Sequence, residues 1–261
     1  MIALTIDCEQ WNCPLLEGKK VNENNETSFS KKGNEIILDL LDKYKIKATF
    51  FITGYFAEKE PEQVRLIKEN GHEIACHGYN HFYRDNKDLD IKQDIVKAKG
   101  ILEKITGENI KGFRAPQMQY SEKLIEILDD LNFKYDSSLH PCYLPGYYNN
   151  LTKPTEIFKP LENCDVIEIP ASVSSFRFPI SWLFIRLFGI NRVIIACKKL
   201  LKKNMRPVLY FHSWEFIEME SKYVPFYYNF HTGKSFAKDI EKLIREFKNA
   251  PFVPLETLIK I

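Results

Sequence analysis

The stretch HEIACHGYNH, residues 72–81, carries two histidines four positions apart directly after a short apolar run. Ile74 and Ala75 are typical of the end of a buried strand, so we expect His77 and His81 where that strand leaves its sheet. In α/β folds, chemistry gathers at the carboxyl ends of parallel strands. A histidine pair at this spacing also arises by chance in many proteins, so the pair alone carries little weight.

Carboxylates that would complete a metal site stand in LTIDCEQW, residues 4–11, an apolar run that ends in Asp7 and Glu9. Two neutral imidazoles and one carboxylate form a common ligand set for catalytic zinc, and they leave one coordination position open for water. The two segments together favour a metal-assisted hydrolase.

The chain has 261 residues, of which 44% are hydrophobic, enough for one α/β barrel or two small domains. Its formal net charge of +2 gives no excess of positive charge of the kind that binds nucleic acid, so we expect no nucleic-acid partner. No run of about eighteen uncharged apolar residues occurs, so we expect no membrane-spanning helix.

Six cysteines are scattered along the chain without a C-x-x-C pair. This pattern favours a reducing compartment, although an even count is also compatible with disulfide bridges. A predicted core strand begins within a few residues of Met1, without the basic and apolar regions of an export signal. We therefore expect a cytoplasmic protein.

Short apolar runs alternate along the chain with segments of helical periodicity. The predicted strands are Ile2–Ile6, Ala48–Ile52, His72–Ala75, Gly112–Arg114, Phe133–Tyr135, Val166–Ile169, Pro207–Phe211 and Phe252–Val253. The predicted helices are Lys32–Tyr44, Glu62–Asn70, Ile91–Thr106, Ser121–Leu131, Ile190–Lys203 and Ser235–Phe247. Repeated units of this length predict an α/β fold with a parallel sheet closed into a barrel. Residues 21–25 and 141–160 are predicted loops, and the second is expected near the site.

Polar side chains also follow three other predicted strands, at Arg114, Asp136 and His212. Each has an ordinary explanation, since a buried arginine is most often an ion-pair partner, a lone histidine a core residue, and Asp-Ser-Ser a turn. In a barrel, however, the ends of successive strands converge on one rim. The joint pattern is hard to explain by packing alone and predicts one site.

The ordered set resembles the polysaccharide deacetylase superfamily, the family-four carbohydrate esterases with a NodB homology domain. Its five motifs match in order across residues 5–214, and FHTGKSF, residues 230–236, resembles one branch. That branch opens with Asp-x-Glu-Asp-Trp, and here Gln10 replaces the second Asp. The resemblance implies a distorted barrel of about seven strands and a single catalytic domain over residues 1–261. It also implies removal of an N-acyl group, most often acetyl, from an amino sugar.

The resemblance implies that Glu9, His77 and His81 bind a divalent metal. The usual carboxylate ligand directly follows the catalytic base, but that neighbour here is Cys8. In an extended strand, residues i and i+2 face one side, so Asp7 and Glu9 would share the site while Cys8 points away. We favour Glu9 over Cys8, provided that the backbone does not turn sharply there. Zinc is expected from the ligand types, although cobalt, nickel or iron would also accept them.

The acid–base residues follow from the same resemblance. Asp7 matches the catalytic base, Arg114 the residue that holds it, His212 the general acid, and Asp136 the carboxylate that pairs with that acid. A backbone N–H near Gln117 is expected to stabilise the oxyanion. The motif RAPQMQ, residues 114–119, lacks the aromatic and glycine common in polymer-acting members. The carbohydrate substrate is therefore left open between a polysaccharide, an oligosaccharide, and a lipid- or nucleotide-linked sugar.

Residues 180–203 combine many apolar side chains with interspersed basic ones. The basic residues are Arg186, Arg192, Lys198, Lys199, Lys202 and Lys203. One interpretation is a pair of barrel-covering helices with a solvated basic face. The other is an interfacial patch that makes peripheral contact with an anionic membrane, so that the protein is membrane-associated.

Two other functions remain open: a hydrolase of a small cyclic amide, like the allantoinase-like relatives in this superfamily, and a non-catalytic, metal-bearing carbohydrate-binding protein. Aromatic residues suit stacking on a sugar ring, but they would equally serve as core or lid residues. They are Tyr143, Tyr147, Tyr148, Trp11 and Trp214. The oligomeric state is left open.

Overall fold

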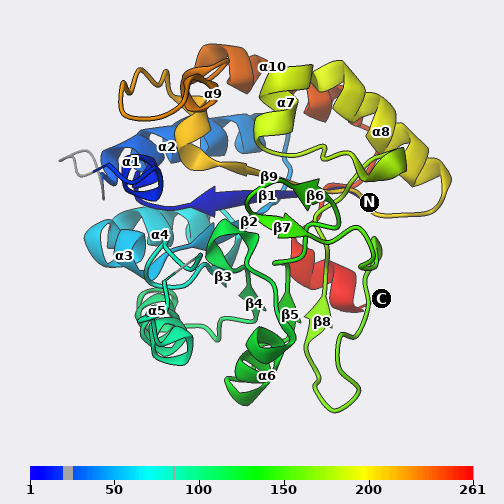
Figure 1. Ribbon diagram of the computed structural model, residues 1–261. Helices are drawn as coiled ribbons and strands as arrows, with labels where there is room; N and C mark the ends of the chain where they lie inside the picture. The colour runs from blue at the N-terminus through cyan, green and yellow to red at the C-terminus, as the bar shows by residue number, and fades with distance from the viewer. Residues whose placement is uncertain (20–25, 85, 261) are drawn as a thin grey trace.

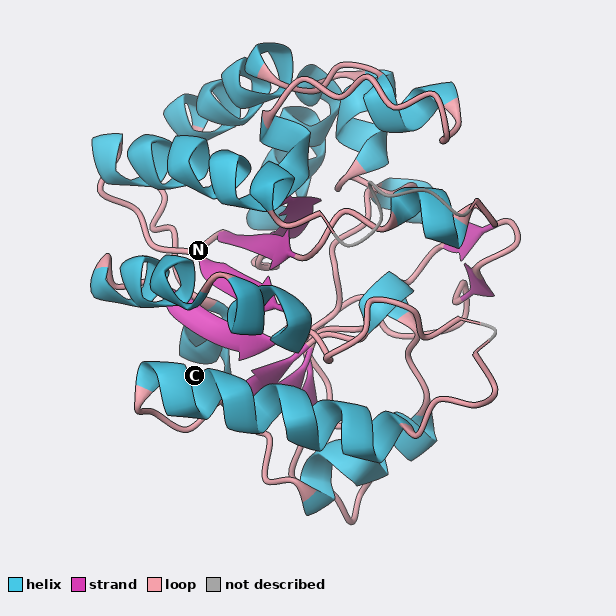
Figure 2. Cartoon of the chain, turned by 90° about the vertical axis from the view of Figure 1, so that its left-hand side faces the viewer, coloured by secondary structure: helices cyan, strands magenta, loops and turns pink. Residues whose placement is uncertain are grey.

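A seven-stranded parallel sheet, curled into a half-barrel, forms the centre of the computed structural model, which describes residues 1–19, 26–84 and 86–260 (Figures 1 and 2). The strand order is β8-β5-β4-β3-β2-β1-β9. The strands are β1 (Ala3–Cys8), β2 (Thr49–Ile52), β3 (Glu73–Cys76), β4 (Gly112–Phe113), β5 (Tyr135–Asp136), β8 (Ile167–Glu168) and β9 (Val208–His212). This architecture confirms the predicted α/β barrel of about seven strands. The predicted loop at residues 21–25 lies outside the described residues.

The half-barrel is partly closed by the chain that follows β8. The Ser172 N–H donates to the Val208 carbonyl at 2.9 Å, and the Trp182 N–H donates to the Tyr210 carbonyl at 2.8 Å. The segment between β8 and the next helix therefore lies beside the outer edge of β9.

Helices surround the sheet in both views (Figures 1 and 2). The six predicted helices are present as α2 (Ser28–Lys43), α4 (Pro61–Glu69), α5 (Ile91–Thr106), α6 (Glu122–Asp130), α8 (Ile190–Lys202) and α10 (Lys234–Glu246). Gly107 ends α5 with a φ of 69°, and the Ser121 hydroxyl caps α6 by accepting from the Leu124 N–H at 3.1 Å. The structure adds α1 (Cys13–Leu16), α3 (Gly54–Lys59), α7 (Leu183–Phe188) and α9 (Phe226–Asn229). These four are too short to establish a helical period in the sequence.

Two predictions need correction. The predicted strand Phe252–Val253 contributes only a single bridge, between Ile2 and Phe252. Proline on each side, at Pro251 and Pro254, lacks the N–H that would extend a ladder. The predicted loop at residues 141–160 contains a short antiparallel hairpin. Its strands, β6 (Tyr143–Leu144) and β7 (Tyr148–Asn149), form a separate two-stranded sheet (Figure 1).

The alternation of side chains along β1 decides which residues reach the barrel interior. Leu4, Ile6 and Cys8 join the large core between the sheet and the helices, whereas Ala3 packs inside the barrel. Because side chains in a strand alternate between faces, Asp7 falls on the interior side with Ala3.

All six cysteines are buried and free, so no disulfide is formed among them. In the part of the chain that the structure describes, no helix is long and apolar enough to cross a membrane.

Candidate metal centre and active site

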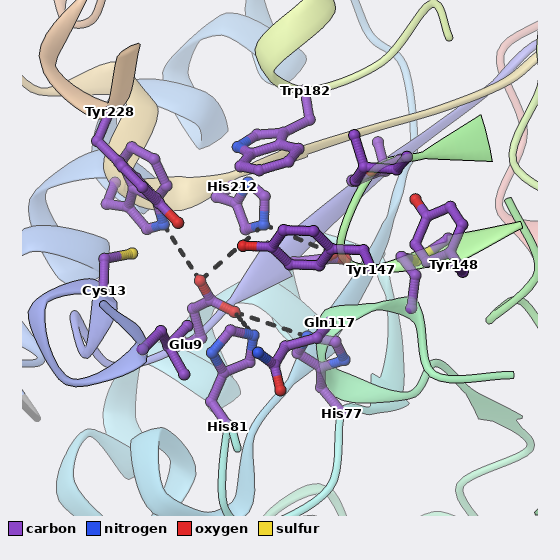
Figure 3. Close-up of a pocket in the computed structure, with 16 residues that line it drawn as sticks. Glu9, Cys13, His77, His81, Gln117, Tyr147, Tyr148, Trp182, His212 and Tyr228 are labelled. Atoms are coloured by element: carbon purple, nitrogen blue, oxygen red, sulfur yellow. Dashed lines mark hydrogen bonds and ion pairs between the residues drawn. The ribbon is translucent and has the colours of Figure 1, made fainter. Parts of the chain in front are cut away.

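Glu9, His77 and His81 converge in a buried cluster where β1 and β3 end (Figure 3). Their ligand atoms all lie within 4.8 Å of one another. Glu9 Oε2 is 2.5 Å from His81 Nε2 and 3.6 Å from His77 Nε2. Although it is buried, Oε2 makes no hydrogen bond within the described residues. A buried carboxylate oxygen without a hydrogen bond, facing two imidazole nitrogens, fits a divalent cation.

The other nitrogen of each imidazole faces a hydrogen-bond acceptor. His77 Nδ1 lies 2.7 Å from the Arg114 carbonyl, and His81 Nδ1 lies 3.1 Å from the Asn12 side-chain oxygen. Asn12 in turn donates its amide N–H to the His81 carbonyl at 3.0 Å. These partners hold the proton on Nδ1 and leave the Nε2 lone pair for a metal. Asn12 was not predicted from the sequence.

Cys8 lies on the opposite face of β1 from the cluster. Its sulfur accepts from the Asn34 side-chain amide at 3.2 Å, and burial raises the pKa of the thiol to about 12. A protonated thiol is a poor metal ligand. The geometry therefore brings Glu9, and not Cys8, beside the two histidines.

The loop that carries both histidines depends on a glycine and on a buried aspartate. Gly78 has a φ of +65°, and a Cβ added there would lie 2.6 Å from the Tyr83 hydroxyl. Asp94, in the first turn of α5, accepts from the N–H groups of Tyr79 at 2.7 Å and Asn80 at 3.1 Å. Its carboxylate also accepts from the Tyr83 hydroxyl at 2.8 Å. Helix α5 thus positions the ligand loop, and the sequence analysis missed Asp94.

Glu9 has an unusual electrostatic environment. Burial alone would raise the pKa of its carboxyl group, but attraction to His81 and His212 and the close approach of His77 lower it well below the usual value. Glu9 Oε1 also accepts from the Trp214 indole N–H at 3.2 Å. The carboxylate is therefore held ionised.

Asp7 is buried beside the cluster and pairs with Arg114. The guanidinium donates from Nη1 to Asp7 Oδ1 at 2.7 Å, and from Nε to the Ser137 carbonyl at 3.0 Å. Its central carbon also lies 4.1 Å from the centroid of the Phe51 ring. Because Arg114 is fully buried and held by several groups, it fixes the orientation of Asp7.

His212 lies across the cluster from His77 and His81 (Figure 3). Its Nδ1 is 3.0 Å from Glu215 Oε1, which also accepts from the His212 backbone N–H at 2.8 Å. Arg186 donates to the other oxygen of Glu215 at 2.5 Å. Burial tends to lower the pKa of His212, but the negative charge of Glu9 and the interactions with Glu215 raise it above the usual value.

The predicted pairing of Asp136 with His212 is wrong. Among the described residues, the carboxylates near His212 are Asp7, Glu9 and Glu215. Four strands separate β5, which contains Asp136, from β9, whereas Glu215 belongs to the turn that directly follows His212. A carboxylate three residues after a helix N-cap commonly folds back onto that cap, so the spacing of HSWE, residues 212–215, was the available signal.

Asp136 instead pairs with a neighbouring acid. It lies opposite Glu168 in the parallel register of β5 and β8, and its Oδ1 accepts from the Ser138 hydroxyl at 2.5 Å. Burial raises the pKa of Asp136 to about 6, and burial together with Asp136 raises that of Glu168 well above the usual value. Burial and the proximity of the two acids therefore disfavour simultaneous ionisation of both carboxyl groups.

A pocket with a cavity volume of about 60 Å³ opens over the cluster, enough for a few ordered waters. Its walls include Tyr147 and Tyr148 of the hairpin region, together with Trp182 (Figure 3). Trp214 lines the pocket but is buried, and Trp11 is a core residue that packs edge-on against it at 4.9 Å. Neither tryptophan stands at an exposed rim.

Comparison with known proteins agrees with the resemblance that the sequence motifs indicated. Residues 26–135 match the family model described as polysaccharide deacetylase. The chain is 31% identical over 150 residues to a peptidoglycan deacetylase of Helicobacter pylori, a match that covers 52% of this chain and 51% of that protein. It is 40% identical over 81 residues to a peptidoglycan-N-acetylglucosamine deacetylase of Bacillus cereus, covering 31% of this chain and 38% of that protein. The matches thus span about half, or less, of the length of these relatives.

Solved structures share the fold over 99% of this chain. A Mycobacterium smegmatis protein assigned by name to the polysaccharide deacetylases has a TM-score of 0.71 at 20% identity, with 88% of that chain covered. The Puue allantoinase has a TM-score of 0.68 at 15% identity, with 88% covered. A family-four pseudoenzyme from Bacillus anthracis has a TM-score of 0.57 at 13% identity, with 65% covered. Residues 26–135 thus belong to the polysaccharide deacetylase family, and the half-barrel and the buried Glu-His-His cluster agree with this membership.

Proposed function

We propose that the protein is a metal-dependent hydrolase that removes the acyl group, in the first instance acetyl, from an N-acylated amino sugar. One observation carries this proposal: Asp7 and His212 face the same Glu9, His77 and His81 cluster. His212 Nε2 lies 4.0 Å from both Asp7 Oδ2 and Glu9 Oε1. A held carboxylate and an imidazole beside a metal-ligand set are the groups that amide hydrolysis needs.

Asp7 would act as the general base. Arg114 occupies its Oδ1, so that Oδ2 is the oxygen left to face the pocket. When bound by Glu9, His77 and His81, a divalent cation such as zinc would polarise the amide carbonyl and acidify the attacking water. Asp7 Oδ2 would accept the water proton, and a backbone N–H near Gln117 would donate to the developing oxyanion.

His212 would act as the general acid. An amide nitrogen leaves poorly unless it is protonated, so a proton donor must reach the sugar nitrogen. Because Glu215 occupies Nδ1, the proton on Nε2 is the one presented to the pocket. The raised pKa of His212 favours its protonated form near neutral pH.

Two features support an N-acyl amino sugar as the substrate. The small cavity over the cluster suits a compact acyl group, while the aromatic side chains around it suit the apolar face of a sugar ring. The relatives named above as peptidoglycan deacetylases point to the same class. Acetate release would be measured with N-acetylglucosamine oligomers, sugar nucleotides and lipid-linked amino sugars. The comparison would show whether the substrate sugar belongs to an oligomer or is linked to a nucleotide or a lipid.

The decisive experiment compares Asp7→Asn with the wild type after zinc loading. We expect the variant to keep bound zinc but to lose nearly all acetate release, because its amide cannot accept a proton. Asp39→Asn, at an exposed position of α2, is the matched control and should retain full activity. An inactive wild type that binds the same sugars would instead support a carbohydrate-binding role, in line with the pseudoenzyme of this fold.

The allantoinase-like alternative rests on the similarity of the fold to the Puue allantoinase. Ring opening of allantoin would be assayed beside acetate release with the same zinc-loaded protein. Turnover of allantoin without acetate release from any amino sugar would replace our proposal by that alternative.

A further inference from the structure

A second groove, lined mainly by apolar side chains, lies away from the metal cluster along α7 and α8. It has a volume of about 410 Å³. Phe178, Phe184 and Phe188 form an aromatic cluster in it, with ring centroids 5.0 to 6.0 Å apart. Leu187 and Ile195 are exposed on the same two helices. An exposed apolar surface of this kind commonly marks an interaction site.

Phe176 stands fully exposed at the end of the loop beside this groove. It has a φ of 68°, and Arg177 has a φ of 56°, a backbone region that L-residues seldom adopt. The Arg177 guanidinium donates to the Lys153 carbonyl at 2.7 Å and to the Pro141 carbonyl at 3.3 Å. These bonds anchor the loop and hold the phenyl ring in solvent.

The charged side chains that line the groove are all basic. Between Glu168 and Glu215 the sequence contains eight lysines and arginines and no acidic residue, although the whole chain carries a formal net charge of only +2. Two of the eight are neutralised by acids from other segments, Arg186 by Glu215 and Lys198 by Glu246. Arg192 and Lys199 line the groove, and Lys203 is exposed further along the chain. In the part of the chain that the structure describes, no acidic side chain forms an ion pair with these three.

We propose that this surface, comprising residues 174–178, α7 and α8, docks on an anionic lipid bilayer. Phe176 and the other exposed apolar side chains would enter the interfacial layer, while the cations would lie at the level of the lipid phosphates. A nucleic acid would neutralise the cations but leave the aliphatic and aromatic groups in water. A symmetric second copy would bring two positive faces together without any acidic partner.

Docking in this way would bring the metal-bearing pocket to the bilayer. Trp182 lines that pocket, and Phe184, two residues later, lines the groove. An amino sugar carried on a lipid would then reach the pocket without leaving the membrane. This last step rests on the proposed function, whereas docking itself is tested without any activity.

The test is flotation of the full chain with vesicles of phosphatidylcholine, alone or mixed with phosphatidylglycerol. We expect binding to the mixed vesicles, weakened by salt because exposed charges are screened. Each cation near the surface contributes about a fivefold gain in partitioning, so Arg192→Gln/Lys199→Gln should bind about 25-fold more weakly. Phe176→Ser should lose about tenfold, because an exposed phenyl ring no longer enters the interface.

The matched control is Val96→Ser/Lys104→Gln on α5, which removes an exposed apolar group and a cation from a helix packed on α3, α4 and β3. It should bind like the wild type, and thermal melts should show that all variants fold. Absence of flotation with mixed vesicles would overturn the proposal, as would equal binding by Phe176→Ser. Capture of RNA through Arg192 and Lys199, or dimerisation through Phe176, without vesicle binding would also overturn it. Failure of the deacetylase assay alone would leave the docking result unaffected.

Discussion

His212 presents Nε2 to the pocket because a carboxylate from its own turn occupies Nδ1. Glu215 reaches both the backbone N–H and the ring of His212, and the buried Arg186 fixes the far oxygen of that carboxylate. Glu215 is therefore a positioning residue, which acts on the substrate only through His212. Its negative charge also favours the imidazolium form that a general acid requires.

Glu215→Gln should shift the pH profile of kcat. The variant keeps a hydrogen-bond acceptor for His212 but loses one of the negative charges that, with Glu9, raise the pKa of the histidine. Because the protonated form donates, activity is present below that pKa and lost above it, so the alkaline limb of kcat should move to lower pH. We expect kcat near neutrality to fall roughly tenfold to a hundredfold with little change in KM.

The control for this prediction is Glu220→Gln, at an exposed position a few residues later, which should keep the wild-type profile. An unchanged alkaline limb in Glu215→Gln, with fold and zinc content intact, would remove Glu215 from the acid–base machinery.

Gly78→Ala should weaken metal binding through the backbone. An alanine at a φ of +65° is strained by about 1–2 kcal/mol, and its Cβ would collide with the Tyr83 hydroxyl. The ligand loop would shift, and zinc affinity should fall about tenfold to a hundredfold, as measured by competition with a chelator. Gly100→Ala is the matched control, because its Cβ meets nothing within 4 Å in the middle of α5. Gly100→Ala should be more stable than the wild type by about 0.5–1 kcal/mol and should bind zinc with unchanged affinity. Equal zinc affinities in Gly78→Ala and Gly100→Ala would contradict the role of Gly78 in the metal site.

At the scale of elements, two kinds of structure build the site. The strands β1, β3 and β9 end at one side of the sheet and carry Asp7, His77 and His212 there or one residue beyond. These positions are held by ladders and by core packing on both faces. The β6–β7 hairpin, by contrast, has only two residues in each strand and pairs with no other strand of the described sheet. Isolated hairpins of this size are marginally stable, so we expect this element to move.

Hydrogen exchange should report that movement. Residues 143–149 should exchange much faster than β1, because few buried contacts oppose their opening. Addition of zinc and an N-acetylglucosamine oligomer should slow exchange in the hairpin, since Tyr147 and Tyr148 line the pocket. Exchange in α6, which contributes no pocket residue, should stay the same. Hairpin exchange that is equally fast with saturating ligand would mean that these tyrosines do not close over the sugar.

At the scale of the whole molecule, the barrel interior has a polar group at each end. The metal cluster lies at the carboxyl end of β3, and Glu73 lies, partly buried, at its amino end. Glu73 accepts from the Thr49 hydroxyl at 2.6 Å, the Tyr135 hydroxyl at 2.7 Å and the Glu256 N–H at 3.1 Å. Burial raises the pKa of Glu73 from 4.5 to about 7, despite these hydrogen bonds.

Glu73 should make stability depend on pH. Its folded pKa lies above its unfolded value, so its contribution is fully present below 4.5 and declines as the pH rises through about 7. Ionisation in the barrel should cost about 3 kcal/mol of unfolding free energy over this window. Glu73→Gln stays neutral, so its stability relative to the wild type should improve between about pH 5 and about pH 8 in urea melts. A pH-independent difference between the two proteins would show that Glu73 does not titrate in this range.

Local patterns in the sequence determined the elements and most of the site. Alternation in LTIDCEQW assigned Asp7 and Glu9 to the site and pointed Cys8 away from it, and the six long helices were recognisable from their periodicity. Such patterns are local, because each depends on a few neighbouring residues in an element of known geometry. For the same reason His77 and His81 could be assigned to a strand exit before their surroundings were known.

Only the tertiary structure decided which groups meet across elements. The sequence shows Asp136 and His212 at strand ends, but only the strand order shows that four strands separate them. Likewise Asp94, on α5, accepts from the N–H of Tyr79 and so holds the loop after β3 that carries His77 and His81. Hydrogen bonds reach only about 3 Å, so such partners depend on the packing of distant segments, which no local pattern in the sequence encodes.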